Sequence, residues 1–139
     1  MLKTAYLFFI GGLFFILDQT LKYFSHNIWT EKNLLSKFFG WYPFENTGVA
    51  FGIPVPSFII IVLSLIILFL LIYLLKNSSP DNHLYRLGLL LIIFGATSNL
   101  LDRILFGFTT DYLLILTSVI NLADVMIVTG FTLFIFTRK

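Results

Sequence analysis

The chain has 139 residues, of which 58% are hydrophobic and 12% are charged, with a mean hydropathy of +0.96. Soluble domains average about 25% charged residues, so the composition argues against an ordinary soluble domain. The net charge of +2 is too small for a nucleic-acid-binding surface, and the absence of cysteine excludes disulfides, thiolate catalysis and cysteine-based metal sites.

Four long apolar stretches follow one another along the chain, at residues 4–24, 57–75, 84–106 and 121–137. Each is close to the ~20 residues that a helix needs to cross a hydrocarbon core about 30 Å thick. A segment in lipid must satisfy its backbone hydrogen bonds internally, which favours helices. The sequence therefore predicts an all-α membrane protein with four transmembrane helices in one domain, residues 1–139. The last stretch is the shortest and can borrow turns from residues 113–120.

The first stretch raises the alternative of a cleaved secretory signal peptide, because Lys3 precedes an apolar run. The run ends in "LDQTLKYF", which offers no small-residue cleavage site, and Asp18 interrupts it. We therefore predict that this segment is retained as the first transmembrane helix.

The segment between the first two predicted helices, residues 25–56, is the one sizeable connection. It mixes aromatic residues with Gly40, Gly48 and Gly52. Aromatic residues at this level are typical of an interfacial belt, and short apolar pieces separated by glycine also allow a small sheet on the membrane surface. We predict a small β-containing segment here.

Four membrane-spanning helices would place both termini on one side. That side would carry more lysine and arginine than the other, at Lys3, Lys76, Arg86, Arg138 and Lys139. The positive-inside rule then places the termini in the cytoplasm and residues 25–56 on the extracytoplasmic side.

The polar residues that interrupt the apolar pattern fall at one depth in this topology, the outer membrane boundary. They are Asp18, Asn46, Asn99, Asp102, Arg103, Asp111, Asn121 and Asp124. Asn99, Asp102 and Arg103 share one helix face through i, i+3 and i+4 spacing. Asn121 and Asp124, at i and i+3, share another. An ionisable residue inside a membrane is costly and indicates a functional site by default.

Structural explanations remain open for two pairs among these residues. Asp102 and Arg103 can form an ion pair or contact lipid headgroups. Asp18 and Lys22 stand at i and i+4, a pair that can simply stabilise a helix end. These pairs alone therefore do not establish an active site.

The other residues differ in how easily a structural role explains them. Asn46 in "ENTGVAFG" can be a turn residue, and Asp111 can be a loop charge or a helix N-cap. Asp124 is harder to explain, because it lies one turn inside an apolar stretch with no lysine or arginine within a helical turn. It therefore needs a partner from elsewhere in the chain.

Two carboxylates in one dry site have a definite chemistry. Like charges a few ångströms apart cannot both ionise cheaply, so the pair holds one proton near neutral pH. The ionised member can take a proton from water while the protonated member donates to a carbonyl, as in aspartic peptide hydrolysis. His26 and His83 lie away from the cluster in this topology, so neither is an alternative base.

Other functions remain conceivable for these residues. A binding site for a hard metal cation could use Asp18, Asp102, Asp111 and Asp124, although no histidine lies nearby. A proton-coupled transporter could use the carboxylates as a relay, but such a path needs polar groups near the membrane midplane. A non-enzymatic lipid-binding assembly factor would need only the outer aromatic residues.

Four motifs stand out along the chain: "DQTLK" (18–22), "ENTGVAFG" (45–52), "GATSNLLDRILFGFTTDY" (95–112) and "INLADVMIVTG" (120–130). In this order they resemble the motifs of lipoprotein signal peptidases, also called signal peptidase II, a family of aspartic peptidases. Each motif is weak alone, but the resemblance covers nearly the whole chain. It implies a bacterial endopeptidase of the cytoplasmic membrane that removes signal peptides from prolipoproteins, cutting before a diacylglyceryl-modified cysteine.

The resemblance also implies the roles of individual residues. The family's catalytic aspartates fall on Asp111 and Asp124. Its supporting or substrate-binding residues fall on Asp18, Asn46, Asn99, Asp102, Arg103 and Asn121. Asp102 is the main rival for a catalytic role, but its helix face suits a supporting function, with Arg103 as its counter-charge.

The family likeness further implies the partners and the location of the protein. It implies no metal and no organic cofactor. Lipid-modified prolipoproteins and membrane lipids are the expected partners of a multi-pass protein whose active site lies near the extracytoplasmic face. We expect a monomer.

The chain departs from the family pattern in three places. Phe94 and Ser98 replace glycines in a motif usually written Gly-Gly-Ala-x-Gly-Asn, so packing at the outer end of the third helix is expected to differ. Ile120 stands where phenylalanine is usual. Only nine residues separate Asp111 from Asn121, which predicts a trimmed structure over the site on that side.

Overall fold

The structure of the chain is a computed structural model that describes residues 2–48 and 55–137. Its elements are α1 (Leu2–Asn27), β1 (Asn33–Ser36), β2 (Phe39–Asn46), α2 (Ser57–Lys76), α3 (His83–Phe106), β3 (Thr109–Ile115), β4 (Ser118–Ile120) and α4 (Leu122–Thr137). The second half of the motif "ENTGVAFG", from residue 49, and the predicted cytoplasmic charges at 138–139 lie outside the described residues. All four predicted apolar stretches form helices, with bounds close to those predicted.

Within residues 2–48 and 55–137, three helices are long and apolar enough to cross a membrane: Ala5–Asn27 within α1, and the whole of α2 and α3. The remaining helix, α4, has 16 residues. At 1.5 Å per residue this is about 24 Å, which is short of the ~30 Å hydrocarbon core. The chain is therefore a multi-pass membrane protein by the length and composition of its helices, and a fourth span by α4 stays a prediction.

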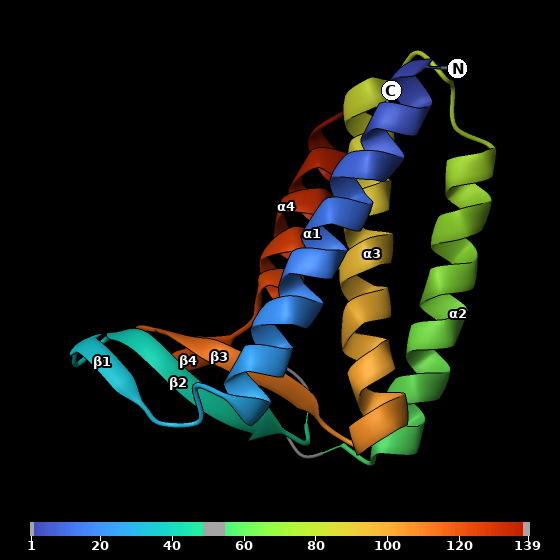
Figure 1. Ribbon diagram of the computed structural model, residues 1–139. Coiled ribbons are helices and arrows are strands. Elements are labelled where there is room, and N and C mark those ends of the chain that lie inside the picture. The colour runs from blue at the N-terminus through green and yellow to red at the C-terminus, as the bar shows by residue number, and fades with distance from the viewer. Residues whose placement is uncertain (1, 49–54, 138–139) are drawn as a thin grey trace.

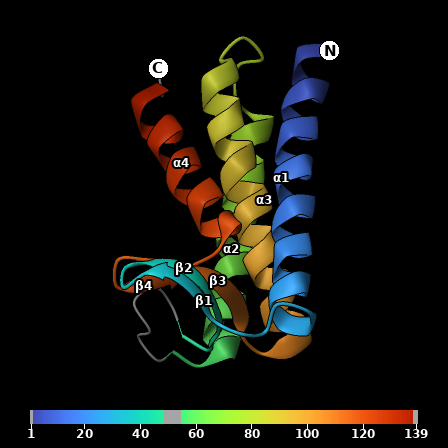
Figure 2. The ribbon, with the colours of Figure 1, turned by 60° about the vertical axis from the view of Figure 1, so that its left-hand side comes forward.

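The helices run side by side, and α3 packs against α1, α2 and α4 (Figure 1). The two ends of the chain lie at the same end of the bundle (Figure 2). At that end Leu7, Leu75, Leu89 and Leu90 form a buried apolar cluster. The outward surfaces of the helices carry many large exposed apolar side chains. This is the surface expected of helices that face lipid rather than water.

Glycine lets α3 and α4 approach closely. A Cβ atom added to Gly130 would lie 2.6 Å from the backbone oxygen of Gly88, and one added to Gly88 would lie 2.7 Å from that of Gly130. A Cβ atom on Gly95 would lie 2.7 Å from the backbone oxygen of Ala123. Small residues allow this backbone-to-backbone packing between membrane helices.

Gly130→Ala is expected to lower the free energy of unfolding by about 1–3 kcal/mol, because the new methyl group meets backbone atoms of α3. Gly12→Ala is the matched control. A Cβ atom there has no neighbour within 4 Å, and alanine favours a helix by up to about 1 kcal/mol. Thermal unfolding of both variants in the same detergent measures the difference. Equal stability would contradict the close approach of α3 and α4.

The four strands form one antiparallel sheet in the order β1-β2-β3-β4. β1 and β2 come from the connection between α1 and α2, which confirms the predicted β-containing segment there. β3 and β4 come from the connection between α3 and α4, so the prediction that residues 113–120 lend turns to the last helix is wrong. The physical reason is pairing with β2, in which Trp41 lies opposite Leu113 and Phe44 opposite Asp111.

The sheet lies at the end of the bundle opposite the termini and projects sideways from it (Figure 1, Figure 2). Its strand β3 packs against both α1 and α3. Gly107 ends α3 in the left-handed conformation, with φ 83°, and lets the chain turn into β3. The helix α4 starts directly after β4. The fold thus brings the ends of α1 and α3, the strands β2 and β3, and the start of α4 to one place.

Candidate functional site

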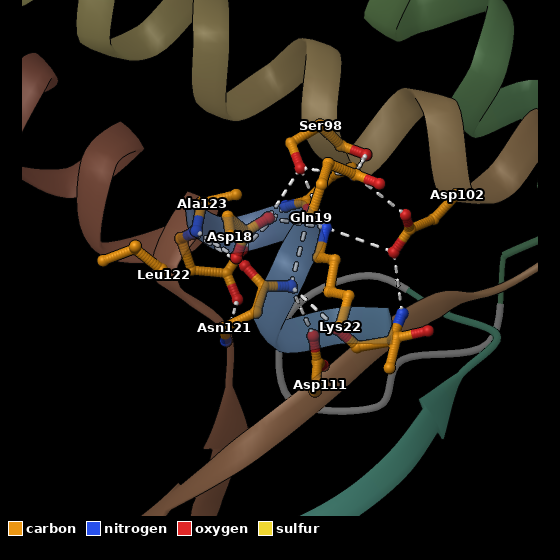
Figure 3. A network of polar contacts seen from close by, with 12 residues as sticks. Asp18, Gln19, Lys22, Ser98, Asp102, Asp111, Asn121, Leu122 and Ala123 are labelled. Atoms are coloured by element: carbon orange, nitrogen blue, oxygen red, sulfur yellow. Dashed lines mark hydrogen bonds and ion pairs between the residues drawn. The ribbon is translucent and has the colours of Figure 1, made fainter. Parts of the chain in front are cut away.

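The predicted polar residues come together where the sheet meets the helix ends. Figure 3 shows Asp18, Asp102, Asp111 and Asn121 among them. Five elements contribute these residues: Asp18 comes from α1, Asn46 from β2, and Asp111 from β3. Asn99, Asp102 and Arg103 come from α3, and Asn121 and Asp124 lie at the start of α4. Most of these residues are buried, and Asp18 and Asn121 have no exposed surface. They form one connected network rather than a set of scattered surface charges.

A capping box explains how an acid stands at the start of an apolar helix. The side-chain oxygen of Asn121 accepts from the backbone N–H of Asp124 (2.9 Å), and the Asp124 carboxylate accepts from the backbone N–H of Asn121 (3.2 Å). This reciprocal pair caps the helix N-terminus, where the helix dipole also favours a negative charge. Asp124 is therefore held at the rim of the bundle by the contacts that start α4.

Asp111 receives one donor on each of its carboxylate oxygens. Asn121 Nδ2 donates to Oδ1 (2.6 Å) and Asn46 Nδ2 donates to Oδ2 (2.9 Å). Asn46 is itself oriented, because its side-chain oxygen accepts from the backbone N–H of Gly48 (3.0 Å). Asn46 thus makes the turn contact typical of its residue type and is also a direct partner of Asp111.

Asn99 is fixed with its amide nitrogen toward Asp124. The Asn99 oxygen accepts from Lys22 Nζ (2.9 Å) and from Asn121 Nδ2 (3.1 Å), so its NH₂ group remains to face the carboxylate. That group donates to Asp124 Oδ1 at 2.9 Å. Lys22 therefore acts on Asp124 through the orientation of Asn99.

Asn121 links the two candidate catalytic carboxylates, since its Nδ2 donates to Asp111 Oδ1 and its backbone N–H donates to Asp124 Oδ2. Burial raises the pKa of Asp111 from the ordinary value of 3.8 to about 7, and the negative charge of Asp124 adds to the rise. The hydrogen bonds from Asn46 and Asn121 lower the pKa of Asp111 but are outweighed. Asp111 therefore keeps a proton to near-neutral pH, as two carboxylates that share one proton require.

Lys22 is the positive centre of a second buried group, next to the pair (Figure 3). Its ammonium lies 3.0 Å from Asp18 Oδ2 and 3.1 Å from Asp102 Oδ2, and it donates to Ser98 Oγ at 3.2 Å. The side chains of Lys22 and Asp18 are 4% and 0% exposed. The predicted helix-end pair is therefore a buried ion triad. Lys22 lies between Asp18 and Asp102, where a metal cation would otherwise supply the positive charge.

The counter-charge of Asp102 is Lys22 and not, as predicted, Arg103. The other Asp102 contacts are a hydrogen bond from the backbone N–H of Thr110 to Oδ2 (3.0 Å) and one from Gln19 to Oδ1 (3.2 Å). Asp102 is thus fully engaged in holding α1, α3 and β3 together, which supports the supporting role predicted for it.

Arg103 turns toward a different part of the site. Its guanidinium donates to the backbone oxygen of Gly48 at 3.1 Å. The carboxylates of Asp111, Asp124 and Asp102 lie near enough to interact with its positive charge. Arg103 therefore supplies a positive charge near the candidate catalytic pair and ties α3 to the end of β2.

Asp18 joins the start of α4 to the network. Its Oδ1 accepts from Tyr112 OH (3.0 Å) and from the backbone N–H of Ala123 (3.1 Å). Tyr112 OH in turn accepts from the backbone N–H of Leu122 (3.0 Å). Burial raises the pKa of Tyr112 above its ordinary value, so the phenol stays protonated and donates to Asp18. One carboxylate thus connects α1 with β3 and α4.

Sequence reasoning missed several members of the network, among them Gln19, which donates to Ser98 Oγ at 2.8 Å and to Asp102 Oδ1 at 3.2 Å. The sequence does mark Lys22 as unusual, because a lysine near the end of an apolar stretch needs a polar partner. Its spacing from Asp18, however, predicts only an ion pair at a helix end. Ser98, which replaces a family glycine, donates to Asp18 Oδ2 at 2.6 Å. Tyr112 carries no signal, because both of its partners come from other segments of the chain.

Residues 10–138 match the protein family described as Signal peptidase (SPase) II. A protein named lipoprotein signal peptidase from Bartonella quintana is 41% identical over 143 residues, which cover 94% of this chain and 85% of that protein. Another of that name, from Bartonella henselae, is 40% identical over 143 residues, covering 94% of this chain and 87% of that protein.

The fold is similar to those of solved bacterial membrane enzymes. One structure, determined by the in meso method at 2.3 Å resolution, has a TM-score of 0.87 at 24% identity and covers 95% of this chain and 86% of that chain. A second, determined at 1.9 Å resolution, has a TM-score of 0.84 at 23% identity and covers 95% of this chain and 91% of that chain. The combination of helices and sheet is therefore one found in bacterial membrane enzymes.

Proposed function

This chain belongs to the signal peptidase II family, and from that membership we propose that it removes signal peptides from prolipoproteins as a membrane endopeptidase. The relatives named lipoprotein signal peptidase match over nearly its whole length. The bond cleaved is the one before a cysteine that carries diacylglyceryl. Family membership gives no support to a proton-coupled transporter or to a lipid-binding assembly factor.

The observation that carries an aspartic mechanism is the linked pair of Asp111 and Asp124. Asn121 bonds to both residues, and the negative charge of Asp124 contributes to the raised pKa of Asp111. Asp102, the rival candidate, is paired with Lys22 instead. Asp111 and Asp124 are therefore the carboxylates left to exchange a proton with a substrate.

Hydrolysis by this pair follows from one shared proton. Asp124, ionised, takes a proton from a water molecule, whose oxygen attacks the carbonyl carbon of the scissile bond while Asp111 donates its proton to the carbonyl oxygen. The resulting diol collapses as the C–N bond breaks. Asp124 then gives its proton to the leaving amine and Asp111 recovers one from the diol, which restores the starting state.

The other site residues support this pair. The asparagines at positions 46, 99 and 121 donate to the two carboxylates and hold their oxygens in place. The triad of Asp18, Lys22 and Asp102 fixes the segments that carry them. Arg103 places a positive charge near the pair.

The proposed topology has α4 as a fourth span and both termini in the cytoplasm. The termini lie at one end of the bundle, and the sheet lies at the other (Figure 1). The polar network lies where this sheet meets the helix ends (Figure 3). The sheet at the foot of α4 makes up for the shortness of that helix. The active site then lies near the extracytoplasmic face, where the end of a signal helix meets water. We propose that the protein is a monomer.

Purified protein in detergent is expected to cleave a synthetic precursor peptide with diacylglyceryl on its cysteine and to leave the unmodified peptide intact. Mass spectrometry of the two products locates the cleaved bond. A protein that unfolds cooperatively on heating but never cleaves the lipid-modified peptide would not be the proposed enzyme. Cleavage of both peptides at the same rate would retain the peptidase and reject its lipid dependence.

In the same assay, the rate is expected to fall as the pH rises through about 7. The mechanism needs one proton on the pair, and the pKa of Asp111 is raised to about 7. Above that pH both carboxylates are ionised and neither can donate to the carbonyl, so activity is lost on the alkaline side. Thermal unfolding over the same pH range is the control for loss of the fold. A constant rate from about pH 6 to about pH 9 would contradict a shared proton.

A further inference from the structure

The end of the sheet that projects away from the helices exposes large apolar side chains. This sheet tip comprises the two hairpin ends, with Leu34, Leu35, Phe38, Phe39, Ile115 and Leu116. Leu35 is 79% exposed, Leu116 is 67% exposed and Phe38 is 52% exposed. A contiguous exposed apolar patch on a protein marks a surface that meets a partner or a membrane.

A contact between the two hairpin turns orders the backbone of the tip. The N–H of Leu116 donates to the backbone oxygen of Phe38 at 2.7 Å. Leu116 has a φ of 58°, the left-handed conformation that leucine adopts only at an energetic cost. Glycine or asparagine would hold the same turn more easily. The chain therefore presents a leucine side chain outward at a position where the backbone disfavours it.

The tip lies at the depth where the spanning helices reach their outer ends. The sheet lies beside the outer ends of α1 and α3 and runs sideways from the bundle (Figure 1, Figure 2). The strands β2 and β3 lead from Asn46 and Asp111 in the site out to the tip. The tip is therefore beside the bundle, level with the membrane boundary.

The charges of the tip fit the same location. Residues 33–39 and 113–120 contain no acidic residue, and Lys37 is their one charged residue. Lys37 Nζ lies 5.7 Å from the centre of the Phe38 ring. An apolar segment flanked by a cation is typical of segments that lie in the boundary between headgroups and acyl chains.

We propose that the sheet tip is a membrane anchor, inserted into the outer lipid leaflet beside the helix bundle. Leu35, Phe38 and Leu116 contact acyl chains, and Lys37 reaches the phosphate groups. Contact with lipid offsets the strain at Leu116. The anchor holds the sheet, and with it Asp111, at a constant height relative to the membrane. This proposal rests on the proposed position of the helices in the membrane and not on the proposed peptidase activity.

The absence of cysteine makes a direct test possible. Leu35→Cys and Leu116→Cys are labelled singly with an environment-sensitive fluorophore and reconstituted in phosphatidylcholine–phosphatidylglycerol vesicles whose acyl chains carry a shallow spin label. Glu31→Cys, in the exposed connection between α1 and β1, is the matched control. Lipid quenching at the tip is expected to exceed that at residue 31 about threefold, because interfacial segments bury ~5–10 Å into the boundary.

Two results of this experiment would overturn the anchor. Quenching of the tip probes by aqueous iodide, as strong as at residue 31, would place the tip in water. Protection of the tip probes from both quenchers would mean that a protein surface, such as a second copy of the chain, covers them.

A second variant separates the apolar contact from the turn itself. Leu116→Asn keeps the left-handed backbone, which asparagine tolerates better than leucine. Lipid quenching of a probe at residue 35 is then expected to fall about twofold while the thermal unfolding temperature stays the same or rises. Unchanged quenching would remove Leu116 from the anchor. No substrate is used, so failure of this proposal and failure of the proposed function are distinguishable.

Discussion

Asp111→Asn and Asp124→Asn are each expected to slow cleavage of the lipid-modified precursor by about 10³-fold or more. A positioned acid or base typically contributes about 10²–10⁴-fold, and groups that exchange one proton act as a unit, so loss of either disables both. An amide at position 111 would also turn an NH₂ group toward the donors of Asn46 or Asn121. Initial rates at saturating substrate measure the effect.

Asp81→Asn is the matched control for this pair of variants. Asp81 is exposed in the connection between α2 and α3, far along the helices from the site. The same chemical change there should leave the rate unchanged. Replacing Asp111 removes a carboxylate whose charged form is disfavoured by burial, so the inactive variant should remain folded. A wild-type rate in either active-site variant would take that aspartate out of the catalytic pair.

Lys22→Met is expected to lower the free energy of unfolding by about 3–5 kcal/mol, because it leaves two buried carboxylates without their positive partner. The ammonium lies within 3.1 Å of both Asp18 and Asp102 and is itself almost fully buried. Water cannot replace it without opening the contact between α1 and α3. Equilibrium unfolding in mixed detergent micelles measures the loss.

Two further variants test the origin of that loss. Lys76→Met, at the exposed end of α2, should change the free energy of unfolding by no more than about 0.5 kcal/mol. Combining Lys22→Met with Asp102→Asn should restore part of the stability, because one of the two unpaired charges is removed. If Lys22→Met were as stable as Lys76→Met, the buried triad would not hold the helices together.

The helices could be predicted from local sequence because the length of an apolar stretch and the thickness of a membrane are directly comparable. The stretches predicted at 57–75 and 84–106 appear as Ser57–Lys76 and His83–Phe106. The same topology correctly placed the polar residues at one end of the bundle. The catalytic roles proposed for Asp111 and Asp124 came from family likeness, since composition and spacing alone left several functions open.

The connection at residues 113–120 could not be predicted as strand from its own residues. It is apolar enough to extend a helix, and it forms β3 and β4 because β2, from a distant part of the chain, pairs with it. Asn121 then caps α4 and ends any extension of that helix toward its N-terminus. The Asn-x-x-Asp spacing of a capping box was the local signal for this boundary.

The sequence by itself determined which segments form apolar helices and which polar residues gather at one end of the bundle. The tertiary structure decided which charge pairs with which: Asp102 with Lys22 rather than with Arg103, and Asp124 with Asn99. The physical reason is the range of the interactions. Burial in lipid depends on a segment's own composition, whereas a buried carboxylate is satisfied by whatever donor the fold brings within about 3 Å, and here those donors come from distant parts of the chain.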